Sequence, residues 1–171
     1  MDSLYYFDFN EDKTGYALLP SMADGNPVPI NGAENDYGVM LSKTWQINLK
    51  DNLEWYFHED IDSEDYETTI DAHDFVETYK FALEQNWFRA ITGGGDFTSA
   101  PQEVVNAQAF ADGEVEWEEV GIKAVDDHTI EFEYVENMSE WTNKYFLSSF
   151  VTTPIHMGLY EDVGESYGTT E

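Results

Sequence analysis

Apolar and polar residues alternate most clearly in two stretches of the chain. In residues 44–49, Trp45, Ile47 and Leu49 fall on one side of an extended backbone, with polar residues on the other side. Residues 129–135 alternate in the same way, with glutamates on the polar side. A period of two residues is typical of a strand that is buried on one face, so both stretches are predicted to be half-buried strands.

Turn residues next to apolar runs predict two hairpins. Residues 121–125 lead into the second of these strands through the turn Asp126-Asp127-His128. Near the start of the chain, residues 4–9 and 16–22 are β-prone runs separated by turn residues, and they form the other predicted hairpin. The stretch 24–38 is rich in Gly, Pro and Asn and is predicted to be a long surface loop.

Helical spacing begins at Asp71, whose side chain can cap a helix, and Asp74 lies favourably near its positive end. The apolar residues that recur at this spacing are Phe75, Val76, Tyr79 and Leu83. Two further helices are predicted. One follows Ser99-Ala100-Pro101 and runs over residues 102–111, and Gly113 ends it.

The third helix is short, and its apolar residues are Met138, Trp141, Tyr145 and Phe146. Pro154 marks a turn before a tail dotted with glycines. Together these elements predict an α+β fold: a mainly antiparallel twisted sheet packed with two to three helices. At 171 residues, positions 1–171 are expected to form a single domain.

The charge narrows the range of partners. The chain has 36 Asp and Glu against 7 Lys and Arg, a formal net charge of −29, yet 42% of its residues are hydrophobic and 16% are aromatic. The apolar content predicts a packed core. A surface this acidic repels phosphate, so nucleic acid and anionic membranes are not expected partners. The simplest interpretation of the charge is that it keeps an exported protein soluble.

Catalytic motifs are difficult to find in this sequence. It has no cysteine, no serine in a Gly-x-Ser-x-Gly elbow, and no two of its four histidines at the spacing that places both on one metal ion. The chain is therefore predicted not to be an enzyme and to need no cofactor. Carboxylates are so abundant that any pair resembles a general acid and base, which leaves a secreted hydrolase as a weak alternative.

An acidic stretch provides a second alternative, a calcium-dependent cell-surface interaction module. Its oxygens alternate along the chain as in a calcium loop, but the glycine and the bidentate glutamate of such loops are missing. The candidate ligands are Asp60, Asp62, Glu64 and Asp71. A solvated acidic loop is the competing interpretation.

The order of four segments carries a resemblance to a known family. Residues 45–55, 69–76, 106–113 and 120–132 follow one another as corresponding motifs do in the oligopeptide- and dipeptide-binding proteins of ABC transporters, which the chain resembles over residues 16–154. Members of that family are several times longer and close two lobes around a peptide. The resemblance therefore implies that this chain is the small subdomain of the first lobe, a fragment of a longer solute-binding protein.

The resemblance also implies a function and a location. The chain would belong to an exported, non-catalytic component that binds a peptide or other small solute and delivers it to the ABC transporter permease. It would lie in the periplasm or on the extracellular face of the cell membrane, held as a lipoprotein by an anchor outside this sequence.

Positional matches to the family give candidate ligand-binding residues. They lie in two segments, one after the helix that carries Phe75 and one before Pro154, and they are Trp87, Phe88, Ser149 and Phe150. The sequence departs from the family's pattern between Tyr56 and Glu67. There, an acidic insertion replaces the short turn that the family has before the helix.

Overall fold

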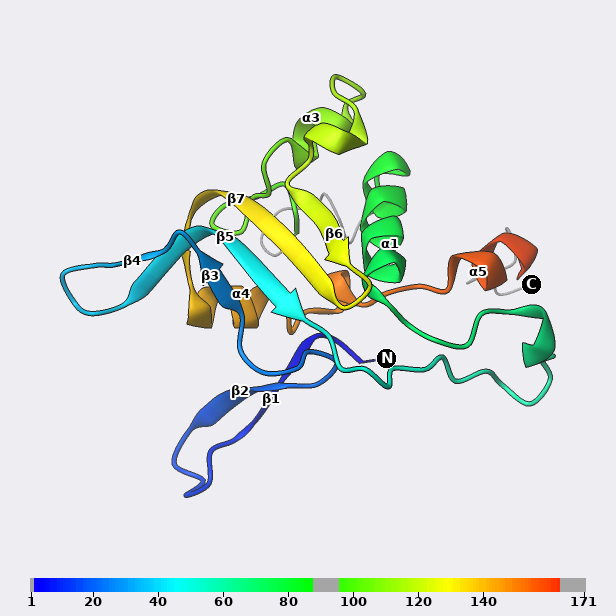
Figure 1. Cartoon of the computed structure of the whole chain (residues 1–171), viewed down its shortest axis with the longest axis horizontal. Coiled ribbons are helices and arrows are strands. Elements are labelled where there is room, and N and C mark those ends of the chain that lie inside the picture. The colour runs from blue at the N-terminus through cyan, green and yellow to red at the C-terminus, as the bar shows by residue number, and fades with distance from the viewer. Residues whose placement is uncertain (1, 88–95, 164–171) are drawn as a thin grey trace.

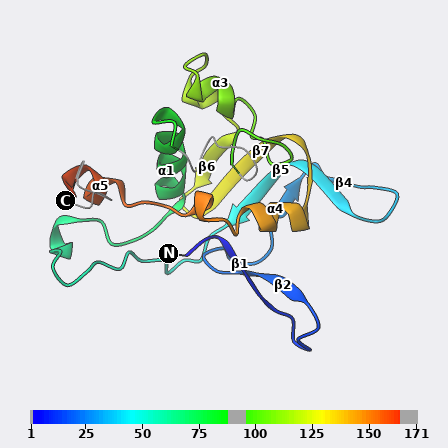
Figure 2. The ribbon, with the colours of Figure 1, turned by 180° about the vertical axis from the view of Figure 1, so that it is seen from behind.

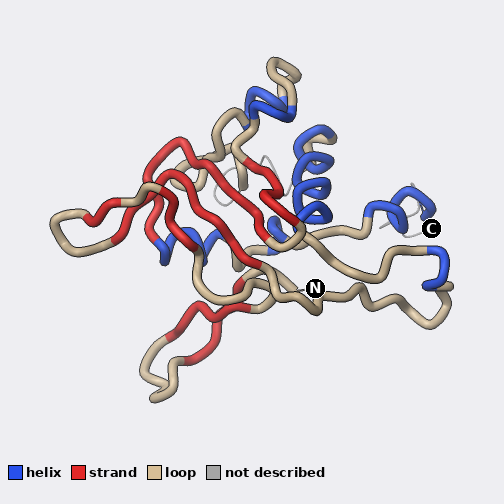
Figure 3. Tube along the Cα trace, in the orientation of Figure 1, coloured by secondary structure: helices blue, strands red, loops and turns tan. Residues whose placement is uncertain are grey.

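A computed structural model describes residues 2–87 and 96–163. Its main sheet has five strands in the order β3-β5-β7-β6, with β4 also paired to β5, and all pairings are antiparallel. The strands are β1 (Tyr5–Phe9), β2 (Tyr16–Pro20), β3 (Val28–Ile30), β4 (Ala33–Glu34), β5 (Met40–Asn48), β6 (Ile122–Asp126) and β7 (Thr129–Ser139). The helices are α1 (Ala72–Glu84), α3 (Ala107–Ala111), α4 (Glu140–Phe146) and α5 (Met157–Val163), with short 3-10 turns η1 (Ser63–Asp65), η2 (Trp117–Glu119) and η3 (Phe150–Thr152). The predicted α+β class is confirmed (Figures 1 and 3).

The two strands predicted from alternation are neighbours at the centre of the sheet. Trp45 of β5 lies opposite Phe132 of β7, and Ile47 lies opposite Ile130. All four side chains are buried. Helix α1 packs over this face: the ring of Tyr79 lies 6.0 Å from the ring of Phe132. One sheet covered by one long helix therefore forms the hydrophobic core.

The other face of these strands carries a row of polar side chains. Gln46 of β5, Glu131 of β7 and Lys123 of β6 are register partners across three strands. Gln46 Nε2 donates to Glu131 Oε2 at 2.7 Å, and Lys123 Nζ lies 2.7 Å from Glu131 Oε1. Burial opposes ionisation of Glu131, but these two donors outweigh it and hold its pKa below the ordinary value.

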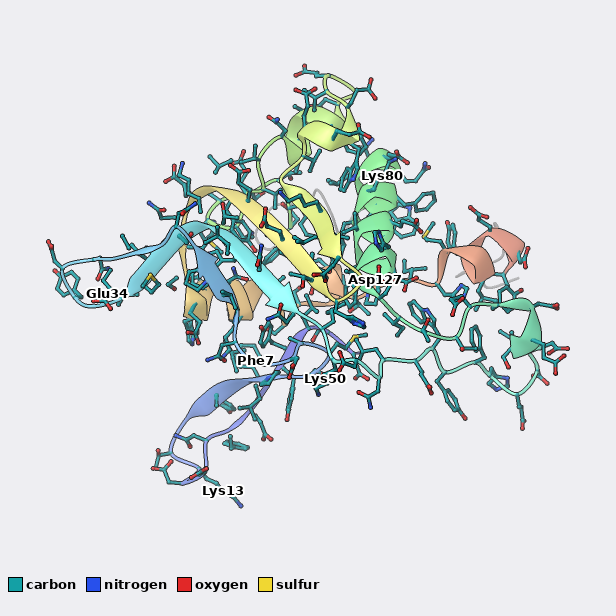
Figure 4. The ribbon with its side chains drawn as sticks, in the orientation of Figure 1. Phe7, Lys13, Glu34, Lys50, Lys80 and Asp127 are labelled. Atoms are coloured by element: carbon teal, nitrogen blue, oxygen red, sulfur yellow. The ribbon has the colours of Figure 1, made fainter. Side chains whose placement is uncertain are left out.

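Helix α1 begins at Asp71, as predicted. Asp71 Oδ1 accepts from the backbone N–H groups of His73 and Asp74, and the Asp74 side chain accepts from the backbone N–H of Asp71. This reciprocal pair is a capping box. The backbone N–H of Ala72 also donates to the Asp127 carbonyl at 2.8 Å, which joins the start of α1 to the β6–β7 turn (Figure 4).

The predicted N-terminal hairpin is confirmed as β1 and β2. The two strands form a separate two-stranded sheet that projects from the body of the protein, with Lys13 at its tip (Figure 4). At its base, Leu4 and Tyr5 are fully buried in the core. The hairpin is therefore anchored at one end and exposed along most of its length.

The prediction of a long surface loop over residues 24–38 missed two short strands, because the segment contains β3 and β4. Val28 and Ile30 pair with β5 on either side of Pro29, which lies opposite Trp45. Proline lacks an N–H donor and is tolerated on an edge strand, so the prolines did not prevent pairing here. β4 then pairs with the start of β5, on an arm at the far side of the molecule from α5 (Figure 2).

The predicted helix over residues 102–111 was wrong in its first half, because α3 begins only at Ala107. Residues 103–105 are extended along β7 instead. Val105 N–H donates to Glu133 O at 2.9 Å, and Val135 N–H donates to Glu103 O at 2.9 Å. This stretch of β7 lies beyond the end of β6, so its backbone groups were available for pairing.

One smaller prediction near the C-terminal end also needs correction. Met138 was placed in the third helix, but it lies in β7, and α4 starts after Ser139 caps it. The glycine-dotted tail after Pro154, for which no element was predicted, contains α5. Within the two described ranges, no helix has both the length and the apolar content needed to cross a bilayer.

Candidate functional site

Two segments far apart in sequence lie side by side at one end of the molecule: the loop that follows β5, residues 53–70, and the C-terminal segment, residues 150–163 (Figures 1 and 2). The C-terminal segment is fixed to α1. Tyr79 Oη donates to the Thr152 carbonyl at 2.7 Å, and Ile155 N–H donates to Thr78 Oγ1 at 2.8 Å.

His156 joins this segment to the acidic loop. Its Nδ1 accepts from the Leu159 N–H at 3.1 Å, so the ring proton belongs on Nε2, which then donates to the Glu67 carbonyl at 2.9 Å. The imidazole is surrounded by three aromatic rings. Their centroids lie 5.3 Å (Trp55), 5.4 Å (Phe57) and 5.4 Å (Tyr66) away. Each of these ring distances lies in the range of favourable aromatic contacts.

A second link lies beside the histidine. Tyr66 Oη donates to Asp162 Oδ2 at 2.8 Å, and this hydrogen bond raises the pKa of Tyr66 above its ordinary value. The Thr69 hydroxyl donates to Glu67 and lowers the pKa of that carboxyl. The end of the acidic insertion is therefore attached to α5 through Tyr66, and to His156 just before α5 through the Glu67 carbonyl.

A cavity of about 490 Å³ lies where the two segments meet, and we call it the seam cavity. Its walls are mostly apolar, and they include the rings of Trp55, Tyr56 and Tyr160. The other lining residues are Asp2, Met22, Leu53, Glu54, Ile70, Thr153, Pro154, Ile155, His156 and Leu159. A second hollow of about 460 Å³ shares Glu54, Trp55 and Tyr56 with it and is otherwise lined by the acidic loop.

The four predicted ligand residues have different surroundings. Trp87 packs at 5.1 Å from Phe81 and 5.6 Å from Tyr160, and Tyr160 is one of the rings that line the seam cavity. Ser149 caps η3 with its side chain, and Phe150 is 62% exposed. Phe88 lies outside the described residues. Neither Ser149 nor Phe150 lines the seam cavity, although the segment they begin continues into its wall.

The four candidate calcium ligands are not gathered around one point. Asp62 caps η1 and Asp71 caps α1, while Asp60 and Glu64 are exposed. Among the described residues, no three His, Asp or Glu side chains form a group suited to a metal ion. The alternation of oxygens along the sequence therefore did not translate into a coordination sphere.

An exposed aromatic face lies on the projecting hairpin and α4, apart from the two hollows, and we call it the hairpin face. It consists of Phe7, Phe9, Tyr16, Trp141 and Tyr145, which are between 48% and 73% exposed. Its rings form two contacting groups: Phe9 stacks on Tyr16, and Tyr145 contacts both Phe7 and Trp141. Exposed aromatic side chains gathered in this way are typical of an interaction surface.

Sequence reasoning missed the seam cavity. Nothing in the sequence neighbourhood of His156 indicates its contact with Glu67, which is 89 positions away. The hairpin face had a weak signal in the sequence. The sequence shows several aromatic residues at positions 5–9, but it does not show which of them are exposed.

Comparisons with known proteins agree with this fold. No family model matches the chain. The chain is 24% identical over 155 residues to the periplasmic oligopeptide-binding protein OppA of Escherichia coli, covering 88% of this chain and 24% of that protein. It is 24% identical over 151 residues to the oligopeptide-binding protein SarA of Streptococcus gordonii, covering 88% of this chain and 19% of that one.

Solved structures share the fold at lower identity. OppA of Haemophilus influenzae, in complex with the peptide RPPGFSPFR, matches 99% of this chain and 27% of its own with a TM-score of 0.66 and 19% identity. OppA of Burkholderia pseudomallei matches 98% of this chain and 27% of its own, with a TM-score of 0.67 and 18% identity. The pheromone receptor PrgZ matches 99% and 27%, with a TM-score of 0.65 and 22% identity.

These findings confirm the resemblance at two levels. In sequence, the chain is similar to oligopeptide-binding proteins, and in fold it corresponds to a part of peptide-binding proteins. The chain spans about a quarter of the length of the curated relatives and solved structures that it matches.

Proposed function

We propose that this chain is part of one lobe of a solute-binding protein that captures peptides for import by an ABC transporter. The observation that carries the proposal is that two kinds of likeness coincide. A sequence match to curated oligopeptide-binding proteins covers 88% of the chain, and the folds of peptide-binding proteins match 97–99% of it. A fold alone does not fix a function, but a fold match and a sequence match to the same class of proteins together favour the function of that class.

The proposed mechanism is capture without chemistry. An extended peptide is held mainly through its backbone between two lobes, and closure of the lobes presents the complex to the permease. The sheet of β5 and β7 covered by α1 serves as a rigid wall of this trap. In this proposal Ser149 and Phe150 meet the peptide, which is supported by the exposure of Phe150 at the start of the C-terminal segment. Trp87 and Phe88 complete the proposed contacts from the other segment.

The proposal includes a longer protein that contains this chain. Its support is the coverage of only a quarter of the matched proteins, together with the hairpin face. Five exposed aromatic rings are costly to leave in water, at roughly 25 cal/mol for each Å² of apolar surface. The remaining part of the lobe would cover this face. The whole protein would work outside the cytoplasmic membrane, held there by a lipid anchor.

Calorimetry tests the proposal. The longer gene product and this chain alone are each titrated with RPPGFSPFR and with a mixture of short peptides. We expect micromolar or tighter binding by the longer protein, and affinity at least about tenfold weaker for this chain, because most contacts come from the other lobe. Absence of binding by the longer protein to any of these peptides would remove the proposed function.

A matched pair of variants tests the proposed contacts in the longer protein. Phe150→Ala removes a 62% exposed ring from the proposed peptide site, and Tyr37→Ala removes a 90% exposed ring from the turn beyond β4. We expect the first change to weaken peptide binding by about tenfold and the second to leave it unchanged. Equal affinities of the two variants would show that Phe150 does not meet the peptide.

A further inference from the structure

The seam cavity has the size and walls of a small-molecule site. Its volume of about 490 Å³ lies within the range of known ligand pockets, about 300–1,000 Å³. Leu53, Ile70 and Leu159 give it apolar walls, and Trp55 and Tyr160 add aromatic surface. Such walls accommodate the hydrocarbon part of a ligand. They do not by themselves say which charge the ligand carries.

The charges around the cavity have one sign. Asp2 and Glu54 belong to its lining, and both residues are exposed. No described lysine or arginine lines it. His156 also lines it, and both of its ring nitrogens are engaged in hydrogen bonds within the chain. With a net charge of −29 on the whole chain, an anionic ligand is repelled and a cation is attracted.

Trp55 contributes an indole ring to the lining of the cavity. The ring of a tryptophan attracts a cation through the charge distribution of its π-system. Its Nε1 is a buried donor with no acceptor among the described residues, which is an unfavourable state for a donor.

We propose that the seam cavity binds a basic side chain, Lys or Arg, of a peptide ligand. Its hydrocarbon stem would lie against the apolar walls and its charged end near Glu54 and Asp2, in the manner of side chains that bury a stem and expose a head. This inference rests on the proposed function, since a peptide is the occupant. It adds a preference for cationic cargo, and a site separate from Ser149 and Phe150.

The test follows the indole N–H signal of Trp55 by nuclear magnetic resonance in this chain, with the signal assigned by Trp55→Phe. The probes are the tripeptides Ala-Lys-Ala, Ala-norleucine-Ala and Ala-Glu-Ala, together with pentylamine. Norleucine has the lysine stem without its charge. We expect Ala-Lys-Ala to shift the Trp55 signal and to bind about three to ten times more tightly than the norleucine peptide, and Ala-Glu-Ala to cause no shift.

Two charge variants separate the effect of a carboxylate in the cavity from the effect of the net charge of the chain. Glu54→Gln removes a carboxylate from the cavity, and Glu34→Gln removes one from β4, on the far side of the molecule (Figure 4). Glu54→Gln is expected to bring the lysine peptide down to the affinity of the norleucine peptide, while Glu34→Gln preserves the difference. Equal affinity of the lysine and norleucine peptides for the unmodified chain would refute the preference for cations.

The remaining outcomes distinguish this inference from the proposed function. If pentylamine shifts the Trp55 signal and none of the tripeptides does, the cavity is a cation site but the peptide occupant is wrong. If no probe shifts the signal while the longer protein binds RPPGFSPFR, the proposed function stands and the inference about the cavity is wrong.

Discussion

The hydrogen bond between Tyr79 and Thr152 is the clearest single link between α1 and the C-terminal segment. Both residues are fully buried, and Tyr79 Oη lies 2.7 Å from the Thr152 carbonyl oxygen. Tyr79→Phe keeps the ring, which packs 4.9 Å from the ring of Phe97, and removes only the hydroxyl. The variant therefore isolates the hydrogen bond from the packing.

The expected cost follows from the burial of the acceptor. A typical hydrogen bond contributes about 0.5–1.5 kcal/mol net, and a buried carbonyl that loses its donor costs about 1–3 kcal/mol. We expect Tyr79→Phe to lower the free energy of unfolding by about 1–3 kcal/mol, which is a large part of the stability of a domain of this size. Thr152 is followed directly by Thr153 and Pro154, which line the seam cavity, so the link also positions one of its walls.

Urea unfolding at constant salt measures this cost, with Tyr37→Phe as the control. Tyr37 is 90% exposed, so the same removal of a hydroxyl is expected to change the free energy of unfolding by less than about 0.5 kcal/mol. The dependence of stability on urea is expected to be the same in all three proteins, since none changes the area buried. If Tyr79→Phe is as stable as the control, the C-terminal segment is not held to α1 by this bond.

Three further predictions concern the sheet and the charge. Gly121→Ala is expected to lower the free energy of unfolding by at least about 2 kcal/mol, because a Cβ there overlaps the Glu133 carbonyl oxygen. In the control Gly15→Ala, the added Cβ meets nothing closer than 3.5 Å, so its melting temperature is expected to stay close to that of the unmodified chain. Glu131 has a lowered pKa, so it stabilises the fold above its ordinary pKa and loses this effect as pH falls through its folded pKa. Glu131→Gln is therefore expected to be about 1 kcal/mol less stable than the unmodified chain at pH 7, with the difference vanishing in acid unfolding experiments. Finally, raising NaCl from 0.05 to 1 M is expected to raise the melting temperature by several degrees, because salt screens the repulsion among the charges that give the net charge of −29. Choline chloride is expected to have the same effect. A rise in melting temperature with calcium alone would instead indicate a specific calcium site.

The centre of the fold was predictable from the sequence because its signals are local. Alternation around Trp45 and Ile130 gave two strands, and Asp71 with Phe75 gave the helix that covers them. Each signal reflects the contact of a side chain with the core on a fixed period of two or 3.6 residues. The structure places these strands side by side in register, which the period alone does not state.

The wrong predictions fall where tertiary pairing decides the local structure. Residues 103–105 follow a proline and a capping serine, which favour a helix, but they pair with the part of β7 that extends beyond β6. Val28 and Ile30 flank Pro29, which favours a loop, but β5 offers them an edge. In both cases backbone hydrogen bonds to a strand distant in sequence outweigh the local preference.

The candidate site was even less accessible to sequence reasoning, because it depends on a junction between distant segments. Trp55 and His156 are 101 positions apart, and their rings lie 5.3 Å from each other. The acidic insertion suggested a calcium site, but in the structure it connects two segments of the chain: Tyr66 and Glu67 attach the insertion to the C-terminal segment. Composition indicated an excess of acid but not the position of these contacts.

The large negative charge contributes little to the fold, but at the seam cavity carboxylates and apolar walls lie together. The core consists of apolar side chains, with few polar groups buried among them, so the 36 carboxylates contribute little to core packing. A few, such as Asp71 and Glu131, support local structure through caps and cross-strand bonds. Asp2 and Glu54 bring this charge to the apolar walls of the seam cavity, which is the basis of its proposed preference for cations. Glu54→Gln changes the net charge of −29 by only one unit, so a loss of the preference in this variant would assign it to the carboxylate in the cavity and not to the charge of the whole surface.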